Sequence, residues 1–164
     1  MNFVECTTAQ QVLDACNSFY EQLVAINDSK AISETKSMFN SIKGATSFYD
    51  VKVGKAMRGK IWFVENKDKK VIGLMRLKDE GAHFHLENLV GIPNVGGGGA
   101  LLDLAKAISM SLEKELVLEA ADKKLIKYYS DRCFNLSTQG GSGMVWKPDT
   151  NVWTKKTVKR RKRS

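Results

Sequence analysis

The sequence predicts a single α/β domain, of the α+β kind, in which helices flank a mixed sheet. Its 164 residues, 43% hydrophobic and 27% charged, are typical of one soluble globular domain with a sizeable core. Apolar residues recur at helical spacing in several segments, and short runs rich in β-branched and aromatic residues lie between turn-forming residues. The predicted order is a strand, two helices, a strand meander, a helix, a strand, a helix and a closing hairpin, which favours helices layered on a sheet.

The first elements lie in the N-terminal quarter of the chain. Residues 1–5 can form a short strand. Thr7 or Thr8 is expected to cap the next helix, with Gln11 as the capping-box partner of Thr8, and apolar residues follow at helical spacing between 12 and 24. A second helix is expected over residues 33–42, ending at Gly44.

The middle and last elements follow the same reasoning. Strands over 61–65 and 71–77 should form a hairpin, and a third strand over 83–92 is stopped by Pro93 and the glycines after it. Residues 100–113 form an amphipathic helix with one apolar face. A strand over 116–120, a helix over 123–132 and a hairpin of 134–139 with 144–147 complete the body.

The basic residues are unevenly distributed, and this predicts a folded domain over residues 1–148 and a basic tail over 149–164. Seven of the 26 Lys and Arg residues lie in 155–164, and removing them leaves 19 against 18 acidic residues. A basic tail attracts polyanions such as nucleic acid by counterion release, and the alternative is a solubilising or disordered terminus. The seven residues are Lys155, Lys156, Lys159, Arg160, Arg161, Lys162 and Arg163.

The sequence also excludes several classes of protein. No segment approaches the roughly 20 apolar residues of a membrane span, and the first residues lack the basic and apolar regions of a signal peptide. The cysteines Cys6, Cys16 and Cys133 are odd in number and widely spaced, which argues against a disulfide framework or a zinc site. We therefore expect a cytoplasmic protein without a membrane partner. Cys133 is expected to be a small buried residue at a helix C-terminus rather than a nucleophile.

Four consecutive glycines, residues 96–99, follow a strand and run into Ala100-Leu101-Leu102. The free N–H groups and the positive dipole end of a helix N-terminus bind phosphate, and glycines let a ligand approach the backbone. The segment has no Gly-Lys-Ser/Thr, so it is not a Walker loop, and a dinucleotide fingerprint would need a glycine at Leu101. The run therefore predicts a pyrophosphate-binding turn between a strand and a helix.

Three segments together resemble the GCN5-related N-acetyltransferase (GNAT) superfamily, in its order and close to its spacing. Residues 89–93 (Leu-Val-Gly-Ile-Pro) resemble the Leu-x-Val-x-Pro end of its fourth strand. Residues 94–102 resemble its Gln/Arg-x-x-Gly-x-Gly/Ala loop and the following helix, and residues 128–134 its Phe-Tyr-x-x-x-Gly-Phe segment. The resemblance covers residues 61–147 and implies the acyl-CoA N-acyltransferase fold, with a mostly antiparallel central sheet. Asn94, Gly91 and Cys133 depart from it, where Gln or Arg, Val and Gly are usual.

The resemblance implies an N-acetyltransferase that uses acetyl-CoA as co-substrate and moves the acetyl group directly to an amine. The fourth strand would bind the pantetheine arm, the turn would bind the pyrophosphate, and Asp122 stands where an Asn often contacts the cofactor. An equally good interpretation makes Asp122 a helix cap. The implied cofactor-binding residues are Leu89, Val90, Gly91, Ile92, Asn94, Gly96, Gly97, Gly98, Gly99, Ala100, Leu101 and Asp122.

Three residues are candidates for proton transfer. Tyr129 aligns with the family's tyrosine that protonates the leaving thiolate, and the alternative is an aromatic residue packed in the core. Glu87 is the first candidate for the base that takes the proton from the amine, with His85 as the second. If the strand is regular, His83, His85 and Glu87 share one face. Because nothing else in the sequence supports a metal ion there, no metal is expected.

The acceptor is an amine, on a protein or an aminoacylated RNA if the tail recruits a polyanionic partner. Two alternatives stay open, a small-molecule amine acetyltransferase with an incidental tail and a non-catalytic GNAT-like module that binds nucleic acid through the tail. The helices near the N-terminus, which line the acceptor site in the family, carry no motif that names the acceptor.

Overall fold

The described residues form one mixed sheet with helices on both faces, as predicted. The computed structural model describes residues 1–44, 59–137 and 142–148. Their seven strands lie in the order β1-β2-β3-β4-β5-β7-β6, and every neighbouring pair is antiparallel except β4 with β5. The strands are β1 (Asn2–Glu5), β2 (Lys60–Glu65), β3 (Val71–Asp79), β4 (His83–Gly91), β5 (Glu115–Glu119), β6 (Asn135–Leu136) and β7 (Gly143–Trp146). The helices are α1 (Ala9–Ala25), α2 (Ser29–Gly44), α3 (Gly97–Ser111) and α4 (Lys123–Ser130).

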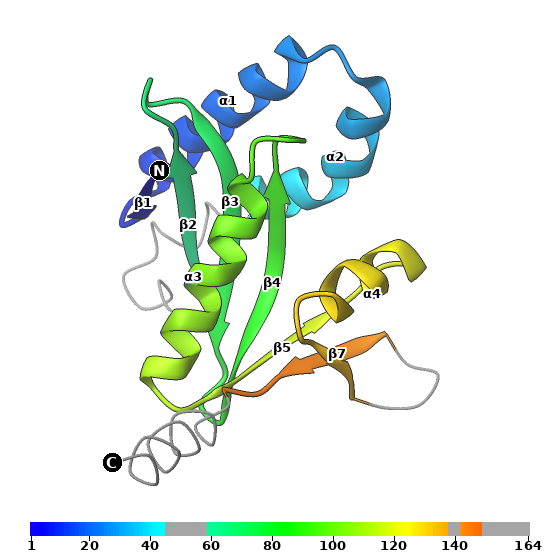
Figure 1. The fold of residues 1–164 in the computed structure, drawn as a ribbon. Coiled ribbons are helices and arrows are strands. Elements are labelled where there is room, and N and C mark those ends of the chain that lie inside the picture. The colour runs from blue at the N-terminus through cyan, green and yellow to red at the C-terminus, as the bar shows by residue number, and fades with distance from the viewer. Residues whose placement is uncertain (45–58, 138–141, 149–164) are drawn as a thin grey trace, which may run out of the picture.

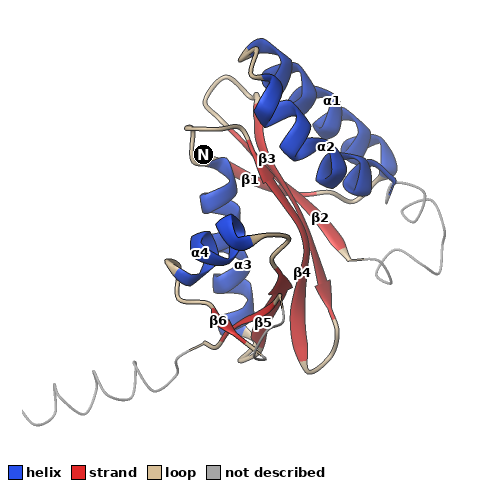
Figure 2. Cartoon of the chain, turned by 90° about the vertical axis from the view of Figure 1, so that its right-hand side faces the viewer, coloured by secondary structure: helices blue, strands red, loops and turns tan. Residues whose placement is uncertain are grey.

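The helices divide between the two faces of the sheet. In Figures 1 and 2, α1 and α2 cover one face, and α3 and α4 lie on the other. Helix α1 contacts β3, α2 contacts β4, and α3 contacts both of these strands. The centre of the sheet, β3 and β4, is therefore buried between two helical layers, and the apolar side chains of β3 are almost all buried.

The N-terminal caps explain where the first two helices begin. Thr8 caps α1 by accepting a hydrogen bond from the Gln11 amide at 3.1 Å. The Gln11 side chain reaches the Thr7 amide at 2.7 Å, one residue before the expected partner. Helix α2 begins four residues earlier than predicted, because the Asp28 side chain accepts from the amides of Lys30 and Ala31, each at 3.1 Å.

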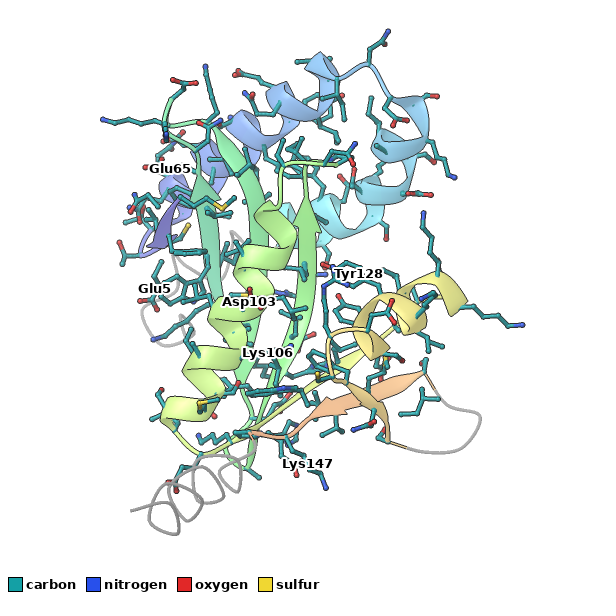
Figure 3. All side chains as sticks on the ribbon, in the orientation of Figure 1. Glu5, Glu65, Asp103, Lys106, Tyr128 and Lys147 are labelled. Carbon is teal, nitrogen blue, oxygen red and sulfur yellow. The ribbon has the colours of Figure 1, made fainter. Side chains whose placement is uncertain are left out.

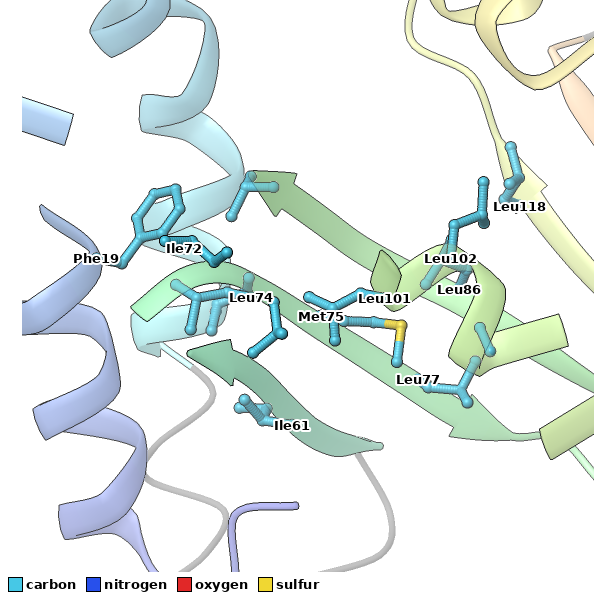
Figure 4. Packing of buried hydrophobic residues seen from close by; sticks show 14 of the residues in the cluster. Phe19, Ile61, Ile72, Leu74, Met75, Leu77, Leu86, Leu101, Leu102 and Leu118 are labelled. Carbon is cyan, nitrogen blue, oxygen red and sulfur yellow. The ribbon is translucent and has the colours of Figure 1, made fainter. Parts of the chain in front are cut away.

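The core joins the two helical layers through the sheet. Figure 4 shows Phe19 of α1 and Leu74 of β3 on one side and Leu101 and Leu102 of α3 on the other. Leu74, Leu101 and Leu102 are fully buried, as is Phe19. Burial of such apolar side chains holds α3 against the sheet, at roughly 1.5–3 kcal/mol for each large residue.

Two local predictions were wrong. Helix α3 begins at Gly97 rather than at Ala100, so three of the four glycines belong to its first turn. Cys133 is exposed rather than buried. Its φ of 72° is left-handed, a conformation that favours glycine, the residue usual at this position in the family that the segment resembles.

The predicted closing hairpin forms between β6 and β7, although β6 is only two residues long.

The described helices include none that is long and apolar enough to cross a bilayer. The predicted domain boundary after residue 148 and the basic tail lie outside the described residues.

Candidate functional site

The glycine turn has the geometry of an anion site at a helix start. Gly96 is the N-cap of α3 with a φ of 79°, and Asn94, two residues before it, has a φ of 67°. The Ala100 amide donates to the Gly96 carbonyl at 3.0 Å, so it is already used within the turn. Within the described ranges, no residue accepts a hydrogen bond from the amides of Gly97, Gly98 or Gly99. These three amides are therefore free to bind an anion.

Glycines at three positions let the start of α3 lie directly on the sheet. A Cβ added to Gly97 would lie 2.3 Å from the carbonyl oxygen of Ile72 in β3. A Cβ on Gly91 would lie 2.6 Å from the Gly98 nitrogen, and one on Gly73 would lie 2.9 Å from Leu101 and 3.0 Å from Gly97. The backbones of β3 and β4 thus fix the position of the free amides.

Gly98 and Gly99 leave more room than Gly97. A Cβ on Gly98 would meet nothing closer than 3.7 Å. A Cβ on Gly99 would have one atom within 4 Å, the hydroxyl oxygen of Tyr128 at 4.0 Å. This open side of the turn is where a ligand can approach the amides.

Strand β4 leaves β5 near a bulge. The two strands pair only over three residues, ending with His85 against Val117. On its other edge, Leu86 pairs with Leu77 and Asn88 with Arg76, so Glu87 is an extra residue without a partner on β3. A bulge of this kind bends the strand and re-aims its side chains.

The bulge changes the face on which the side chains lie. Before it, Phe84 lines a pocket with Ile108 of α3. After it, the Asn88 side chain accepts a hydrogen bond at 3.3 Å from Ser41 of α2, on the opposite face. Regular alternation would have placed Phe84 and Asn88 on the same face, so β4 is irregular at Glu87. The bulge follows His83 and His85, and it leaves their alternation unchanged.

A cavity of about 340 Å³ lies where the two strands diverge. It is lined by the bulge of β4, by the end of β5 and by residues that follow β5 or precede β7. His85 and Glu87 both line it, so the structure brings these two predicted residues together at one open site. The lining residues are His85, Leu86, Glu87, Asn88, Glu119, Ala120, Ala121 and Ser142.

His85 and Glu87 are hydrogen-bonded to each other. The His85 Nδ1 lies 3.0 Å from Glu87 Oε1. Because a carboxylate only accepts, Nδ1 carries the proton in this contact, and in the neutral imidazole the lone pair is then on Nε2. Arg76 lies 3.8 Å from the other oxygen of Glu87, and its buried Nε has no hydrogen-bond partner among the residues that the structure describes. Arg76 was missed by the sequence analysis because only the pairing of β3 with β4 places it beside Glu87.

A second acidic residue approaches the same histidine. Glu80 Oε1 lies 4.0 Å from His85 Nδ1, and one ligand atom from each of Glu80, His85 and Glu87 lies within 4.8 Å of the others. The residue whose side chain approaches the His85–Glu87 pair is thus Glu80. The Arg76 guanidinium competes with any cation for the Glu87 carboxylate.

Tyr129 is buried in α4 between two aromatic rings. Its ring meets Tyr128 edge-on at a centroid distance of 5.1 Å and Phe134 at 5.5 Å. Burial is the main cause that raises the pKa of Tyr129 to about 12, with a smaller contribution from Tyr128. The Tyr129 hydroxyl therefore keeps its proton at neutral pH and can act only as a donor of that proton.

The other predicted residues lie around the turn or in the core. Asp122 caps α4 by accepting from the Leu125 amide at 2.8 Å, as the capping alternative predicted. Leu101 is fully buried, so only its backbone belongs to the turn. Residues 89–92 continue β4 beyond the three residues that pair with β5, up to the glycine turn. Val90 and Ile92 are buried, and Leu89 packs against the core.

Comparisons with known proteins bear on the fold. No protein-family model matches the sequence, and no curated protein matches it significantly. Among solved structures, the chain is similar to an acetyltransferase of the GNAT family from Staphylococcus aureus Mu50, with a TM-score of 0.59 and 16% identity over 90% of this chain and 99% of that one.

Two further solved structures are similar to this chain in fold. Tetrahymena GCN5 matches with a TM-score of 0.56 and 16% identity over 90% of this chain and 98% of its own. A histone acetyltransferase HPA2 and related acetyltransferase from Corynebacterium glutamicum matches with a TM-score of 0.56 and 14% identity over 90% and 95%. A mixed, mostly antiparallel sheet that opens at a bulge in β4, beside a glycine-rich helix start, thus belongs to a chain with the fold of the GNAT acetyltransferases.

Proposed function

We propose that this protein is an N-acetyltransferase that uses acetyl-CoA and transfers the acetyl group directly to an amine. The observation that carries the proposal is the arrangement of two features along β4. The His85–Glu87 pair lies where β4 leaves β5, and the free amides of the glycine turn lie at the end of the same strand. The GNAT fold of its structural neighbours supports this function.

The coenzyme would bind along β4. The pyrophosphate would accept hydrogen bonds from the amides of Gly97, Gly98 and Gly99, which the helix dipole of α3 favours. The amide groups of the pantetheine arm would bind the backbone of residues 89–92, beyond the last β4 residue paired with β5. The thioester would then reach the cavity that His85 and Glu87 line.

The chemistry needs one base and one acid. The neutral amine attacks the thioester carbonyl, a C–N bond forms, the C–S bond breaks, and the thiolate leaves with the electron pair. His85 Nε2 would take the proton of the amine, because Glu87 holds the proton on Nδ1. Tyr129 would protonate the thiolate. Glu87 acting directly as the base is the alternative, and the relative rates of His85→Gln and Glu87→Gln distinguish the two.

A binding and turnover experiment tests the proposal. Calorimetric titration with acetyl-CoA should give saturable binding, and release of free thiol should depend on an added amine. The Glu87→Gln variant, which keeps the size of the side chain and removes its charge, should bind acetyl-CoA normally and turn over more slowly. Failure of the wild-type protein to bind acetyl-CoA at millimolar concentration would refute the proposal and favour a non-catalytic module.

The basic tail would decide which class of acceptor the enzyme uses. A polyanionic partner, a protein or an aminoacylated RNA carrying the amine, would be recruited by residues 155–163. A small-molecule amine would need no tail. A chain that lacks residues 155–164 should therefore lose activity only on an acceptor that the tail recruits.

A further inference from the structure

The Tyr128 side chain lies beside the open side of the glycine turn. Its hydroxyl oxygen lies 4.0 Å from a Cβ built on Gly99, and among the described residues no other atom outside the neighbouring backbone of α3 lies within 4 Å of that Cβ. Figure 3 shows Tyr128 on the side of α4 that faces α3 and β4. The hydroxyl therefore lies beside the first turn of α3, which carries the three free amides.

The Tyr128 ring is held in place on two sides. The Arg132 guanidinium lies over the ring at 3.5 Å from its centroid, and the same group donates to the Tyr128 carbonyl at 2.9 Å. The edge of Tyr129 closes another side at 5.1 Å. A stacked and hydrogen-bonded ring loses little freedom when its hydroxyl binds a ligand, which makes it a preorganised donor.

Helix α4 is tied to α3 by a separate contact. Lys106 of α3 donates to the carbonyl of Arg132 at 2.6 Å, and its ammonium lies between the rings of Phe134 and Trp146, at 5.3 Å and 5.6 Å. Burial lowers the pKa of Lys106, which is consistent with a side chain enclosed at this junction. The contact fixes the end of α4 that carries Tyr128 relative to α3.

The Tyr128 hydroxyl has unused bonding capacity. Among the described residues, no side chain or carbonyl hydrogen-bonds to the Tyr128 hydroxyl. Tyr128 is half-buried, so its ring is partly shielded from solvent while the turn beside it stays open. A fixed donor next to three free amides completes a site for a doubly charged anion, since each phosphate oxygen can accept more than one hydrogen bond.

We infer that Tyr128 is a coenzyme-binding residue, whose hydroxyl donates a hydrogen bond to the pyrophosphate held by the amides of Gly97, Gly98 and Gly99. The inference rests on the proposed function, and it gives a role to Tyr128, for which the sequence alone suggested none. It divides the two neighbouring tyrosines by task. Tyr128 binds the phosphates, and Tyr129 acts at the thioester.

Binding by three ligands tests this role. CoA and dephospho-CoA both carry the pyrophosphate, and pantetheine lacks it. Tyr128→Phe should weaken the binding of CoA and dephospho-CoA about tenfold, as expected for a hydrogen bond to a charged group, and leave pantetheine binding unchanged. The matched control is Tyr20→Phe, which removes the same atom from an exposed tyrosine on α1.

The outcomes separate the inference from the proposed function. If wild-type protein binds CoA and Tyr128→Phe binds it equally well, the inference is wrong and the proposed function stands. If the variant loses pantetheine and CoA to the same extent, Tyr128 only supports the packing of the site, and the inference is again wrong. If the wild-type protein binds none of the three ligands at millimolar concentration, the proposed function and the inference fall together.

Discussion

Gly97 touches the backbone of Ile72 so closely that a Cβ on Gly97 would lie 2.3 Å from the Ile72 carbonyl oxygen. The first residue of α3 thus rests on β3 without a side chain between them. The same carbonyl accepts a hydrogen bond from the amide of Ile92, at the end of β4, at 2.9 Å. One peptide group of β3 therefore positions both the end of β4 and the start of the helix whose amides are free.

Gly97→Ala should destabilise the protein by about 1–3 kcal/mol, because the added methyl group would have to push the helix away from rigid backbone. The free energy of unfolding, measured in urea, checks this. Coenzyme binding should weaken as well, because the amides of the turn would move with the helix. A variant as stable as the wild type would contradict the close contact.

Gly99→Ala is the matched control for this prediction. It adds the same methyl group two residues later, where the nearest atom would lie at 4.0 Å. Since alanine favours the helix more than glycine does, the stability should stay within about 1 kcal/mol of the wild type, on the more stable side. Equal losses in the two variants would show that the glycine run is needed for its flexibility and not for this contact.

The regular elements could be predicted because their signals are local. The cap at Thr8 and the hairpin of β2 with β3 follow from residues close together in the sequence. The start of α3 could not be predicted from the sequence. Glycine is a poor helix former, and only contact with β3 and β4 makes three glycines helical. The early start of α2 was missed because Asp28 lies before residues with little apolar periodicity.

The site was predictable in its parts and not in its assembly. The glycine turn and the positions of His85 and Glu87 follow from the sequence pattern. The bulge at Glu87 depends on the pairing of β4 with β3, which joins residues distant in sequence. The position of Tyr128 beside Gly99 depends on how α4 docks on α3, and no local pattern specifies that.

Cys133→Gly should stabilise the protein by about 1 kcal/mol. The residue is exposed and holds a φ of 72°, so glycine would remove the strain of a Cβ in a left-handed conformation and bury no less surface. Thermal denaturation measures the change. Cys133→Ala keeps the Cβ and should gain nothing, and equal stabilisation by both substitutions would point to the thiol instead of the backbone.

Tyr129→Phe should lower kcat by roughly 10² and leave the affinity for acetyl-CoA nearly unchanged, because it removes only the proton donor for the thiolate. The raised pKa, about 12, predicts that the wild-type rate shows no loss from this residue at pH values up to 10. Stopped-flow or steady-state assays of thiol release check the rate. An unchanged kcat would assign Tyr129 to core packing.

The same pKa predicts how the stability depends on pH. Folding raises the pKa of Tyr129 above its ordinary value of 10.0, so its contribution to stability is full below pH 10 and is lost as the pH rises toward 12. The free energies of unfolding of the wild type and Tyr129→Phe, measured between pH 9 and 12, should therefore change relative to each other in favour of the variant. A constant difference over this range would contradict the burial of the phenol.

If the tail recruits a polyanionic partner, removal of residues 155–164 should weaken binding to nucleic acid and make that binding less dependent on salt. The segment carries seven basic residues and no acidic one, and each phosphate contact adds about −0.9 to the slope of log K against log salt on a duplex. Fluorescence anisotropy with a labelled duplex at 50 and 200 mM salt measures the slope. Equal slopes for the full and shortened chains would show that the tail is not the nucleic-acid-binding segment.

His85→Gln should lower kcat/KM by 10²–10⁴, since it would remove the imidazole that is proposed to take the proton of the amine. Glu87→Gln should reduce the rate less, because the amide oxygen can still accept from Nδ1 at 3.0 Å and keep Nε2 directed to the amine. If Glu87→Gln lowers kcat/KM more than His85→Gln does, Glu87 is the base, and the histidine only orients it.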